Sequence, residues 1–472
     1  MKIAYSLFSL LLFMNTIILF FQYQVYSSSE SEQQLTYNYS QEVNVTYREN
    51  RFFVRHHFFS LPSEEVRITW PLNSENRACY GDDDESCSRL TDNLNSFTKG
   101  KATKQTISYE IPVKEPLTNQ QLWKGVFALL SGGTANTSIV HLTDETKSGG
   151  MWLTGLPSIG KTSLSLVDYT LFNGKGVIGD LYWQKEPLSA VYKNHQLTLY
   201  ANQPLDNQKV TALSNIKFPD TNHIAVIESL SGADFHANRI VFIPSTKLPN
   251  FEEEILIRGV QSQYSFSADT THSLETLTSF LSNRAVGSEK SKAMYDSLIG
   301  YMTKSQREAW IENLQQLNGQ PVSPELLDEW LSNTLNHQTS FFQLNERSKA
   351  RIPLLFEETR TVYINELEKQ EMNIILTDGR VLYSLEPMMS MIGYTTEQGE
   401  NGFYIKNAAR SFRFPLDEPF YVFNERRYDA LSQPLEKIGD SYYIEESWLI
   451  RLFFVDIQKE EKRINISSSA LF

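Results

Sequence analysis

Hydrophobic residues are distributed unevenly along the chain, and the longest apolar stretch lies near its start. Residues Ile3 to Phe21 include no charged side chain. Nineteen residues of helix, at about 1.5 Å of rise each, nearly span a hydrocarbon core of about 30 Å. Lys2 precedes the stretch and Arg48 is the next basic residue, so the positive-inside rule predicts export of the chain that follows.

Residues 1-26 are therefore expected to form a single-pass membrane anchor or an uncleaved signal. Residues 27-34, rich in Ser, Glu and Gln, are expected to be a polar tether. A cleaved signal is the alternative, because Val25-Tyr26-Ser27 is a weak but permissible cleavage site. In both cases we expect the bulk of the chain to be extracytoplasmic.

Residues 35-268 have the pattern of a β-rich domain. Runs of β-branched and aromatic residues, separated by polar linkers with Gly, Asn or Pro, are typical of strands. One helix is expected within them near residues 119-130, where Leu122, Val126 and Leu130 have helical spacing. The expected strands are Val43 to Tyr47, Phe52 to Phe59, Val66 to Trp70, Gln105 to Val113, Ser138 to Leu142, Leu197 to Ala201, Ile224 to Ile227 and Arg239 to Ile243.

Helical periodicity replaces this pattern in residues 269-345, which are expected to form a small helical subdomain. Thr303 and Gln306 make a capping box ahead of apolar residues at helical spacing. Ser323 and Pro324 supply the N-cap and the first-turn proline of another helix.

The last hundred residues contain an internal repeat with an offset of sixty residues. Gly379 to Tyr383 aligns with Gly439 to Tyr443, and Met388-Met389 aligns with Trp448-Leu449. Each unit is expected to form a strand, a tight turn, a strand, a short helix and a closing strand. Because neither ββα unit buries its apolar face alone, we expect the two to pack as a pair within residues 355-466. The expected core includes Leu382, Met389, Ile392, Tyr443, Trp448 and Leu452.

This repeat resembles the copper-amine-oxidase N-terminal-like domain, also called the stalk domain, of exported Gram-positive proteins. The family pattern is a Gly-Arg turn, an apolar strand and a helix that closes on Leu-Gly. Gly379-Arg380 and Ile392-Gly393 match it in the first unit. Gly439 and Trp448-Leu449 match it in the second unit, which lacks the Arg and the Leu-Gly. The resemblance covers residues 361-466 and implies a non-catalytic envelope module without copper ligands or a quinone-forming tyrosine.

Charge and cysteine content narrow the classes of partner. The net charge of −13 argues against nucleic acid, whose phosphates require clustered Lys and Arg. Cys79 and Cys87 are close in sequence, and in an exported chain such a pair is expected to form a disulfide. Residues 82-85 between them are all acidic. A solvated surface loop is the favoured interpretation of this segment, and a calcium loop is the alternative.

Residues Gly155 to Thr162 match the phosphate-loop pattern GxxxxGK[ST]. That motif requires a helix directly after it, because the helix N-terminus supplies N–H groups that bind phosphate. Here Ser163 to Val167 alternate polar and apolar residues, and Asn173-Gly174 precedes the apolar segment Val177 to Trp183. This pattern favours a β-hairpin, so we expect neither a nucleotide nor a cofactor to bind.

No catalytic pattern is complete in this sequence. Ser158 lacks the first glycine of a nucleophile elbow. A β-rich half followed by helices is the rough layout of zinc aminopeptidases, and Asp269, His272 and Glu275 are three residues apart. No second histidine lies one turn away, so the usual ligand pair is missing. We therefore assign no catalytic, cofactor-binding or metal-ligating residue, and the disulfide is the one site expected.

Together these patterns predict an α+β chain with an N-terminal membrane helix, a β-rich domain, a small helical subdomain and a C-terminal pair of ββα units. We expect a membrane-anchored extracytoplasmic protein with a non-catalytic binding or scaffolding role toward an unknown cell-envelope partner or polymer. The alternative is an envelope hydrolase whose site lies in residues 35-345 and is positioned by the stalk-like domain. A pocket lined by two ionisable groups with shifted pKa values would favour the hydrolase.

Overall fold

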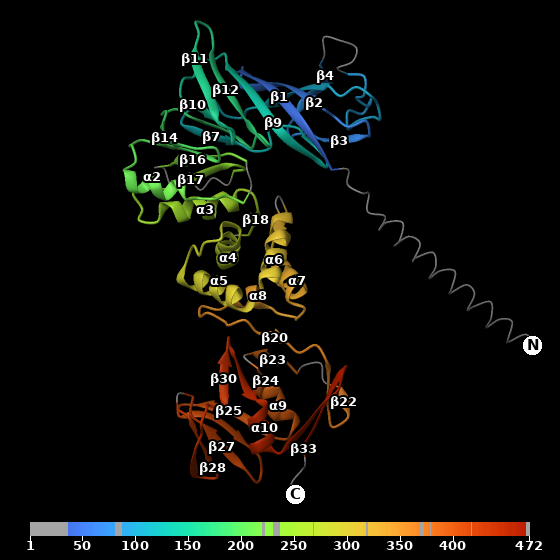
Figure 1. The fold of residues 1–472 in the computed structure, drawn as a ribbon, viewed down its shortest axis with the longest axis vertical. Helices are drawn as coiled ribbons and strands as arrows, with labels where there is room; N and C mark the ends of the chain where they lie inside the picture. Colours follow the sequence, from blue (N-terminus) through green and yellow to red (C-terminus); the bar gives the residue numbers. More distant parts are fainter. Residues whose placement is uncertain are drawn as a thin grey trace, which may run out of the picture. The chain divides into compact units, whose positions relative to one another are not determined.

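A computed structural model describes residues 36–80, 87–219, 222–229, 237–267, 269–317, 320–368, 372–377, 379–416 and 418–468. The described chain is α+β, as expected (Figure 1). The expected anchor and tether, residues 1-34, lie outside the described residues, as do the acidic residues of the loop between the cysteines. Within the described part of the chain, no helix combines the length and the apolar character needed to span a membrane.

Two compact units make up the chain. Unit 1 comprises Met1–Ser214 and Asp220–Leu248, and unit 2 comprises Asn215–Pro219 and Pro249–Phe472. The division therefore falls before α3 (Phe251–Gln261), which lies inside the region expected to be β-rich. Val260 at the end of α3 packs in the core of the helices that follow, and this contact explains why α3 belongs to unit 2.

Unit 1 is built on a seven-stranded sheet with the strand order β11-β12-β9-β1-β2-β6-β4. β1 runs parallel to β9 and antiparallel to β2. Alternate residues of β1, including Val43, Val45 and Tyr47, are buried in the core of the unit, as the two-residue period of a strand requires. The strands are β1 (Tyr37–Arg48), β2 (Arg51–Phe59), β4 (Glu75–Cys79), β6 (Gln105–Pro112), β9 (Gly133–Asp144), β11 (Ser158–Ser163) and β12 (Asp168–Lys175).

Three smaller sheets complete unit 1. One has the order β5-β3-β8, formed by β5 (Ser96–Phe97), β3 (Val66–Thr69) and β8 (Leu129–Leu130). Another has the order β10-β13-β7, formed by β10 (Met151–Leu153), β13 (Leu181–Gln184) and β7 (Gln120–Trp123), and it leaves β7 at an edge. The third consists of β14 (Ser189–Lys193), β15 (Leu197–Ala201), β16 (Ile224–Glu228) and β17 (Ile240–Ile243), with α2 (Asn207–Ser214) between β15 and β16.

The expected strands are confirmed, but the helix expected near residues 119-130 is wrong. Gln121 and Trp123 instead pair with Trp183 and Leu181 of β13. The left-handed backbone of Gly125, with φ of 59°, turns the chain directly after β7. Leu122, Val126 and Leu130 have the spacing of a helix, but pairing with a strand some sixty residues later determines the conformation of this segment.

Unit 2 begins with helices, and the sequence located the starts of two of them. Thr303 and Gln306 form the expected capping box of α6. Ser323 caps α7, with Pro324 in its first turn. The helices after α3 are α4 (Thr271–Ser282), α5 (Glu289–Tyr301), α6 (Lys304–Gln316), α7 (Pro324–Leu335) and α8 (Phe341–Arg347), with the short strands β18 (Ser265–Phe266) and β19 (Pro321–Val322) between them.

The C-terminal repeat forms one shared sheet with the order β20-β23-β24-β31-β30. Each half provides a hairpin followed by a helix and a closing strand, as expected. The first half contains β23 (Ile374–Thr377), β24 (Arg380–Ser384), α9 (Leu385–Met391) and β25 (Thr395–Gly399), and the second contains β30 (Leu435–Ile438), β31 (Ser441–Glu445), α10 (Glu446–Phe453) and β32 (Val455–Lys459).

The remaining strands of unit 2 extend or flank this sheet. A five-stranded sheet has the order β25-β26-β27-β28-β29, and a four-stranded sheet has the order β22-β21-β33-β32. Their other members, together with the edge strand of the shared sheet, are β20 (Phe356–Glu357), β21 (Thr361–Ile364), β22 (Leu367–Glu368), β26 (Gly402–Lys406), β27 (Ser411–Phe414), β28 (Phe420–Phe423), β29 (Arg426–Asp429) and β33 (Arg463–Ser468).

The offset of the repeat needs a correction of one residue in its strands. β24 and β31 begin at Arg380 and Ser441, which are 61 residues apart and not sixty. Leu382 and Tyr443 consequently share one apolar cluster, while Tyr383 and Ile444 share another. A slip of one residue moves every side chain of a strand to the opposite face, so the offset of sixty misassigned the faces of β31.

Local chemistry explains the turns and the core of the repeat. Gly379 and Gly439 have φ of 74° and 61° in the two hairpin turns, a conformation that favours glycine. The expected core residues are buried except Ile392, which is half-buried. Those that are buried are Leu382, Met389, Tyr443, Trp448 and Leu452.

Candidate functional site

A cavity of about 550 Å³ opens in unit 1 between three segments of chain. We call it the tryptophan pocket. Its walls are Thr69 to Asn73 at the end of β3, Ile111 to Glu115 at the end of β6, and Gln121 to Phe127 with Leu129. The walls combine aromatic, aliphatic and proline side chains with a few polar groups, which is the composition of many ligand sites.

Trp70 forms one end of the pocket. A hydrogen bond from its indole N–H and a ring contact fix its position. Its indole N–H donates to the carbonyl of Leu94 at 2.7 Å. Its ring packs edge-on against Tyr109 with centroids 5.6 Å apart. The hydroxyl of Tyr109 in turn donates to the carbonyl of Val126 at 3.0 Å. The same tyrosine thus fixes Trp70 and the opposite wall.

Trp123 on β7 is half-buried and rests on two rings of the core. It stacks on Trp152 at 5.7 Å and meets Phe52 edge-on at 5.0 Å. Asp180 fixes the turn that follows, because its carboxylate accepts from the N–H of Gly125 at 2.9 Å and from that of Asn238 at 2.8 Å. The ring of Trp123 is therefore rigidly supported from behind while part of it faces the pocket.

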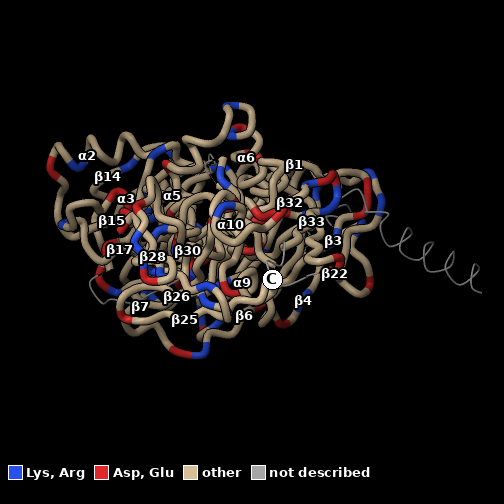
Figure 2. Tube along the Cα trace, turned by 90° about the horizontal axis from the view of Figure 1, so that it is seen from below, with Lys and Arg blue, Asp and Glu red and all other residues tan. Residues whose placement is uncertain are grey.

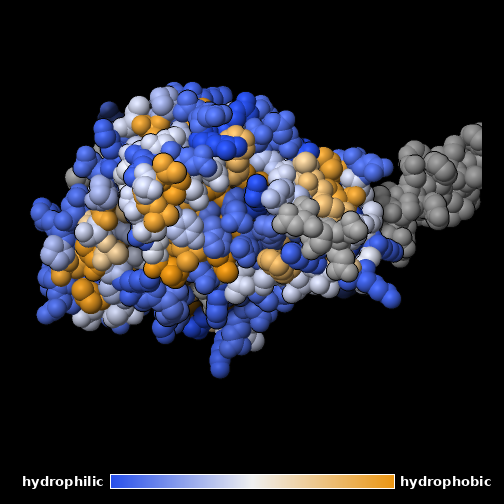
Figure 3. Space-filling model, turned by 90° about the horizontal axis from the view of Figure 1, so that it is seen from above, coloured by the Kyte–Doolittle hydropathy of each residue, from blue (hydrophilic) through white to orange (hydrophobic). Residues whose placement is uncertain are grey.

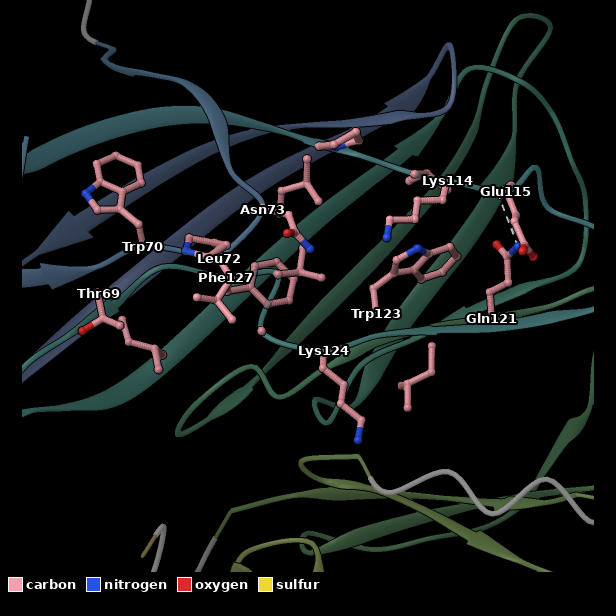
Figure 4. A pocket seen from close by; sticks show the side chains of 18 residues that line it. Thr69, Trp70, Leu72, Asn73, Lys114, Glu115, Gln121, Trp123, Lys124 and Phe127 are labelled. Carbon is pink, nitrogen blue, oxygen red and sulfur yellow. Dashed lines mark hydrogen bonds between the residues drawn. The ribbon is translucent and has the colours of Figure 1, made fainter.

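The rim of the pocket carries exposed apolar and basic groups. The side chain of Leu72 is 98% exposed and that of Leu129 is 50% exposed. Lys114 and Lys124 are exposed, and neither forms an ion pair within the part of the chain that the structure describes. Figure 4 shows Lys114 reaching toward the ring of Trp123, while Lys124 extends in a different direction.

A second recess, of about 650 Å³, lies on the outer face of the seven-stranded sheet. Its charged groups largely satisfy one another. Arg48 lies 3.9 Å from Glu145 and above the ring of Phe53, and Arg55 lies above the ring of Tyr80 at 4.1 Å. Because these groups are already engaged, the tryptophan pocket is the stronger candidate for ligand binding.

His56, His223, Asp180 and Asp328 have shifted pKa values, and none of them is among the residues that line the tryptophan pocket. Burial lowers the pKa of His56 to about 3 and that of His223 to about 4. Burial raises the pKa of Asp180, although the hydrogen bonds from the N–H groups of Asn238 and Gly125 act to lower it. Burial raises the pKa of Asp328 in unit 2 to about 7. Each of these groups holds a neighbouring segment through hydrogen bonds, which is a structural role.

Basic and acidic residues are interspersed along the described part of the chain (Figure 2). Blue Lys and Arg segments alternate with red Asp and Glu segments in Figure 2. The basic groups at the tryptophan pocket are thus a local feature of an acidic chain whose net charge is −13.

The expected disulfide between Cys79 and Cys87 is confirmed, with Cα atoms 5.8 Å apart. Cys79 ends β4 and lies opposite Ile107 of β6. The bridge therefore ties the loop to the edge of the seven-stranded sheet. The acidic residues 82-85, for which a calcium loop was the alternative, lie outside the described residues.

The phosphate-loop string is not followed by a helix, as expected, but its residues from Ser158 onward form a strand and not a connection between strands. Ser158 to Ser163 make β11, which pairs with β12, although the turn lies at residues 164-167 and not at Asn173-Gly174. Lys161 donates to the carbonyl of Gly150 at 2.5 Å. His223 lies 2.8 Å from the carbonyl of Gly155. This segment lacks the helix N-terminus that the motif requires.

The start of α5 is contacted by two members of the group Asp269, His272 and Glu275. The carboxylate of Glu275 accepts from the N–H and hydroxyl of Ser288, the N-cap of α5, at 2.9 and 2.7 Å. His272 lies 3.0 Å from the hydroxyl of Ser291. Asp269 is exposed. Among the described residues no group of three metal-ligating side chains gathers at one point.

Sequence reasoning missed the tryptophan pocket. Trp70 and Trp123 were assigned to a strand end and a helix, and nothing in the local pattern connects residues 69-73 with 111-129. The available signal was the segment between Val113 and Gly125, which contains Lys, Pro and Gly beside an aromatic residue and is typical of a loop that presents side chains.

Comparisons with known proteins identify no family for the chain. No family model matches it, and no curated protein matches it. An M1 zinc metallopeptidase from Deinococcus radiodurans is similar over 66% of this chain and 93% of that chain, with a TM-score of 0.39 and 11% identity. A mutant of a two-domain M1 zinc metallopeptidase bound to L-arginine covers the same shares, with a TM-score of 0.37 and 11% identity. These scores are too low to carry a conclusion about this chain.

Proposed function

We propose that this protein is a membrane-anchored, extracytoplasmic envelope protein of a Gram-positive bacterium that binds an envelope component in the tryptophan pocket. The C-terminal repeat, which resembles the stalk domain, serves as a non-catalytic module. The apolar stretch at the N-terminus supports the anchor, and the disulfide supports an oxidising compartment.

The observation that carries the proposal is the combination of rigid and open surfaces in the tryptophan pocket. Trp123 is supported by Trp152 and Phe52, so binding requires little ordering of its side chain. Leu72 and Lys114 on the rim are exposed. Pre-organised aromatic surface next to unpaired charge favours recognition, because less conformational freedom is lost when the ligand binds.

The alternative role as a hydrolase requires acid–base groups at the pocket. The charged residues of its lining are Lys114, Glu115 and Lys124. Asp180, the nearby carboxylate with a raised pKa, is committed behind the wall to two backbone N–H groups. This arrangement supports binding better than it supports hydrolysis.

Retention on isolated envelope tests the binding role. Purified protein should sediment with envelope fragments of the host, and Leu72→Asp should reduce the retained amount at least about fivefold. Leu431→Asp is the matched control, because Leu431 is fully exposed in unit 2. Equal retention of both variants would exclude the pocket as the binding site. New amino termini or reducing ends released from the envelope would support the hydrolase instead.

Labelling in intact cells tests the location. Cys79 and Cys87 are bonded to each other, so Ser468→Cys introduces a single free thiol. A membrane-impermeant thiol reagent should label it without permeabilisation. Labelling that appears only after the cells are opened would contradict an extracytoplasmic location.

A further inference from the structure

We infer that the tryptophan pocket binds an extended acidic peptide segment that adds as a strand to the free edge of β7. This inference deepens the proposed function, on which it rests, by naming the ligand class. It combines the open strand edge, the apolar wall and the exposed lysines of one pocket.

The free edge of β7 is the first element of this inference. β7 lies at the end of the order β10-β13-β7, so only its β13 side is paired. An unpaired edge presents N–H and C=O groups that can pair with another chain. Addition of a peptide strand to such an edge is a recurring mode of recognition. The lining of the pocket includes β7 from Gln121 to Trp123.

The register shows which backbone groups are available. The N–H of Lys185 donates to the carbonyl of Asn119 at 2.8 Å, and antiparallel pairs alternate between bonded and non-bonded positions. Gln121 and Trp123 therefore direct their backbone groups to β13, while those of Leu122 point to the free edge. The N–H and C=O of Leu122 have no hydrogen-bond partner within the described residues.

The side chains around this edge define the chemistry of the ligand. Trp123 and Leu72 offer apolar surface, which suits an aliphatic side chain. Lys114 and Lys124 are exposed cations of the rim, and Glu115 is the carboxylate of the lining. Lys124 also interacts electrostatically with Asp180 behind the wall. The net positive charge of the rim favours carboxylates on the peptide.

Exposed apolar side chains occur at several places on the molecule. Orange apolar patches interrupt a mostly hydrophilic surface in Figure 3. Other exposed apolar side chains of unit 1, such as Leu164 and Leu166, line neither the tryptophan pocket nor the second recess. At β7 an open strand edge, a cavity and exposed lysines occur together.

The probe is the hexapeptide Val-Asp-Val-Asp-Val-Asp with blocked ends, used with the full-length protein. We expect it to bind, and the same peptide with all six backbone amides N-methylated to bind at least about tenfold more weakly. Its lysine counterpart, Val-Lys-Val-Lys-Val-Lys, should bind at least about fivefold more weakly at low salt. These comparisons separate backbone pairing from burial of valine alone.

Variants of the protein test the same contacts from the other side. Leu122→Pro removes the outward N–H, and proline is tolerated on an edge strand where the N–H faces away from the sheet. It should weaken binding at least about tenfold, whereas Leu122→Ala, which keeps the N–H, should weaken it less than about threefold. Lys114→Gln should weaken binding about threefold at low salt, and Lys99→Gln, an exposed lysine outside the pocket, should leave it unchanged.

Each outcome decides one claim. Equal binding of the methylated and unmethylated peptides would overturn strand addition. This comparison uses the unmodified protein, so it remains valid if Leu122→Pro fails to fold. Binding of an N-acetylglucosamine oligosaccharide in the pocket without binding of the hexapeptide would overturn the inference of a peptide ligand. It would show that the ligand of the pocket is a glycan. In that case loss of envelope retention in Leu72→Asp would still support the proposed function. Peptide binding combined with retention that does not depend on Leu72 would overturn the proposed function alone.

Discussion

Trp448 of unit 2 differs in its surroundings from Trp70 and Trp123 of unit 1. Trp448 of the C-terminal repeat lies on α10 with 4% of its surface exposed, and it contacts the ring of Tyr421. Trp70 and Trp123 of unit 1 are half-buried and face a cavity. The buried ring stabilises the fold, whereas the half-buried rings are fixed by neighbours that leave surface for a ligand. Burial, more than residue type, distinguishes a core residue from a binding residue.

The first way to sharpen this comparison is to remove the buried ring. Trp448→Ala should destabilise unit 2 by about 3–5 kcal/mol, because it deletes a large side chain from a packed core. Urea unfolding of the full-length protein, followed by hydrogen exchange in each unit, measures the effect. Unit 1 should keep its stability. A loss below about 1 kcal/mol would show that Trp448 is not a core residue.

A fall in pH should change the stability of the two units in opposite directions, by an expected amount on the order of 3 kcal/mol for each buried group. His56 and His223 in unit 1 have pKa values of about 3 and about 4 when folded, below the unfolded value of about 6.5. Their contribution to the stability of unit 1 is present above pH 6.5 and is lost as the pH falls through 4 and then 3. Unit 1 should therefore become less stable on acidification.

Asp328 in unit 2 makes stability depend on pH in the opposite direction. Its pKa of about 7 in the folded state exceeds the unfolded value of about 3.9. Its contribution is present below pH 3.9 and is lost as the pH rises through 7. Hydrogen exchange in urea between pH 4 and 7 should show unit 1 gaining and unit 2 losing stability as the pH rises. Asp328→Asn should remove the slope of unit 2, and an unchanged slope would refute the assignment to Asp328.

The disulfide has a smaller expected effect, confined to unit 1. Cys79→Ser should lower its stability by about 1–3 kcal/mol, because the bridge restricts a short loop in the unfolded chain. The unit should still fold, since its apolar core is extensive. The variant and the reduced protein should unfold at the same temperature. Full unfolding of either at 25 °C would contradict this estimate.

Lys161→Ala should have the smallest effect. Lys161 is exposed on β11 and makes one hydrogen bond, to the carbonyl of Gly150. Loss of an exposed contact of this kind changes stability by about 0.5 kcal/mol or less. Calorimetry with ATP should show no binding by either protein. Micromolar binding that the substitution abolishes would contradict the prediction that residues 155-162 bind no nucleotide.

The comparison of the tryptophans also explains which features the sequence could predict. The surroundings of Trp448 follow from local pattern, because the stripe on α10 and the repeat predict its burial. The capping box of α6 is equally local. Trp123 depends on pairing with β13 and on Asp180, which are distant in sequence, so local periodicity assigned it to a helix. The one-residue error in the offset of the repeat has a similar cause, since the register is fixed by the pairing of β24 with β31.

Amide exchange at Leu122 tests the central claim, that the open edge of β7 in the tryptophan pocket binds an extended peptide. In the free protein the N–H of Leu122 should exchange fast, while those of Gln121 and Trp123, which face β13, should be protected. Saturation with Val-Asp-Val-Asp-Val-Asp should slow exchange at Leu122 at least about tenfold and leave its two neighbours unchanged. Fast exchange at Leu122 with the peptide bound would contradict strand addition to β7.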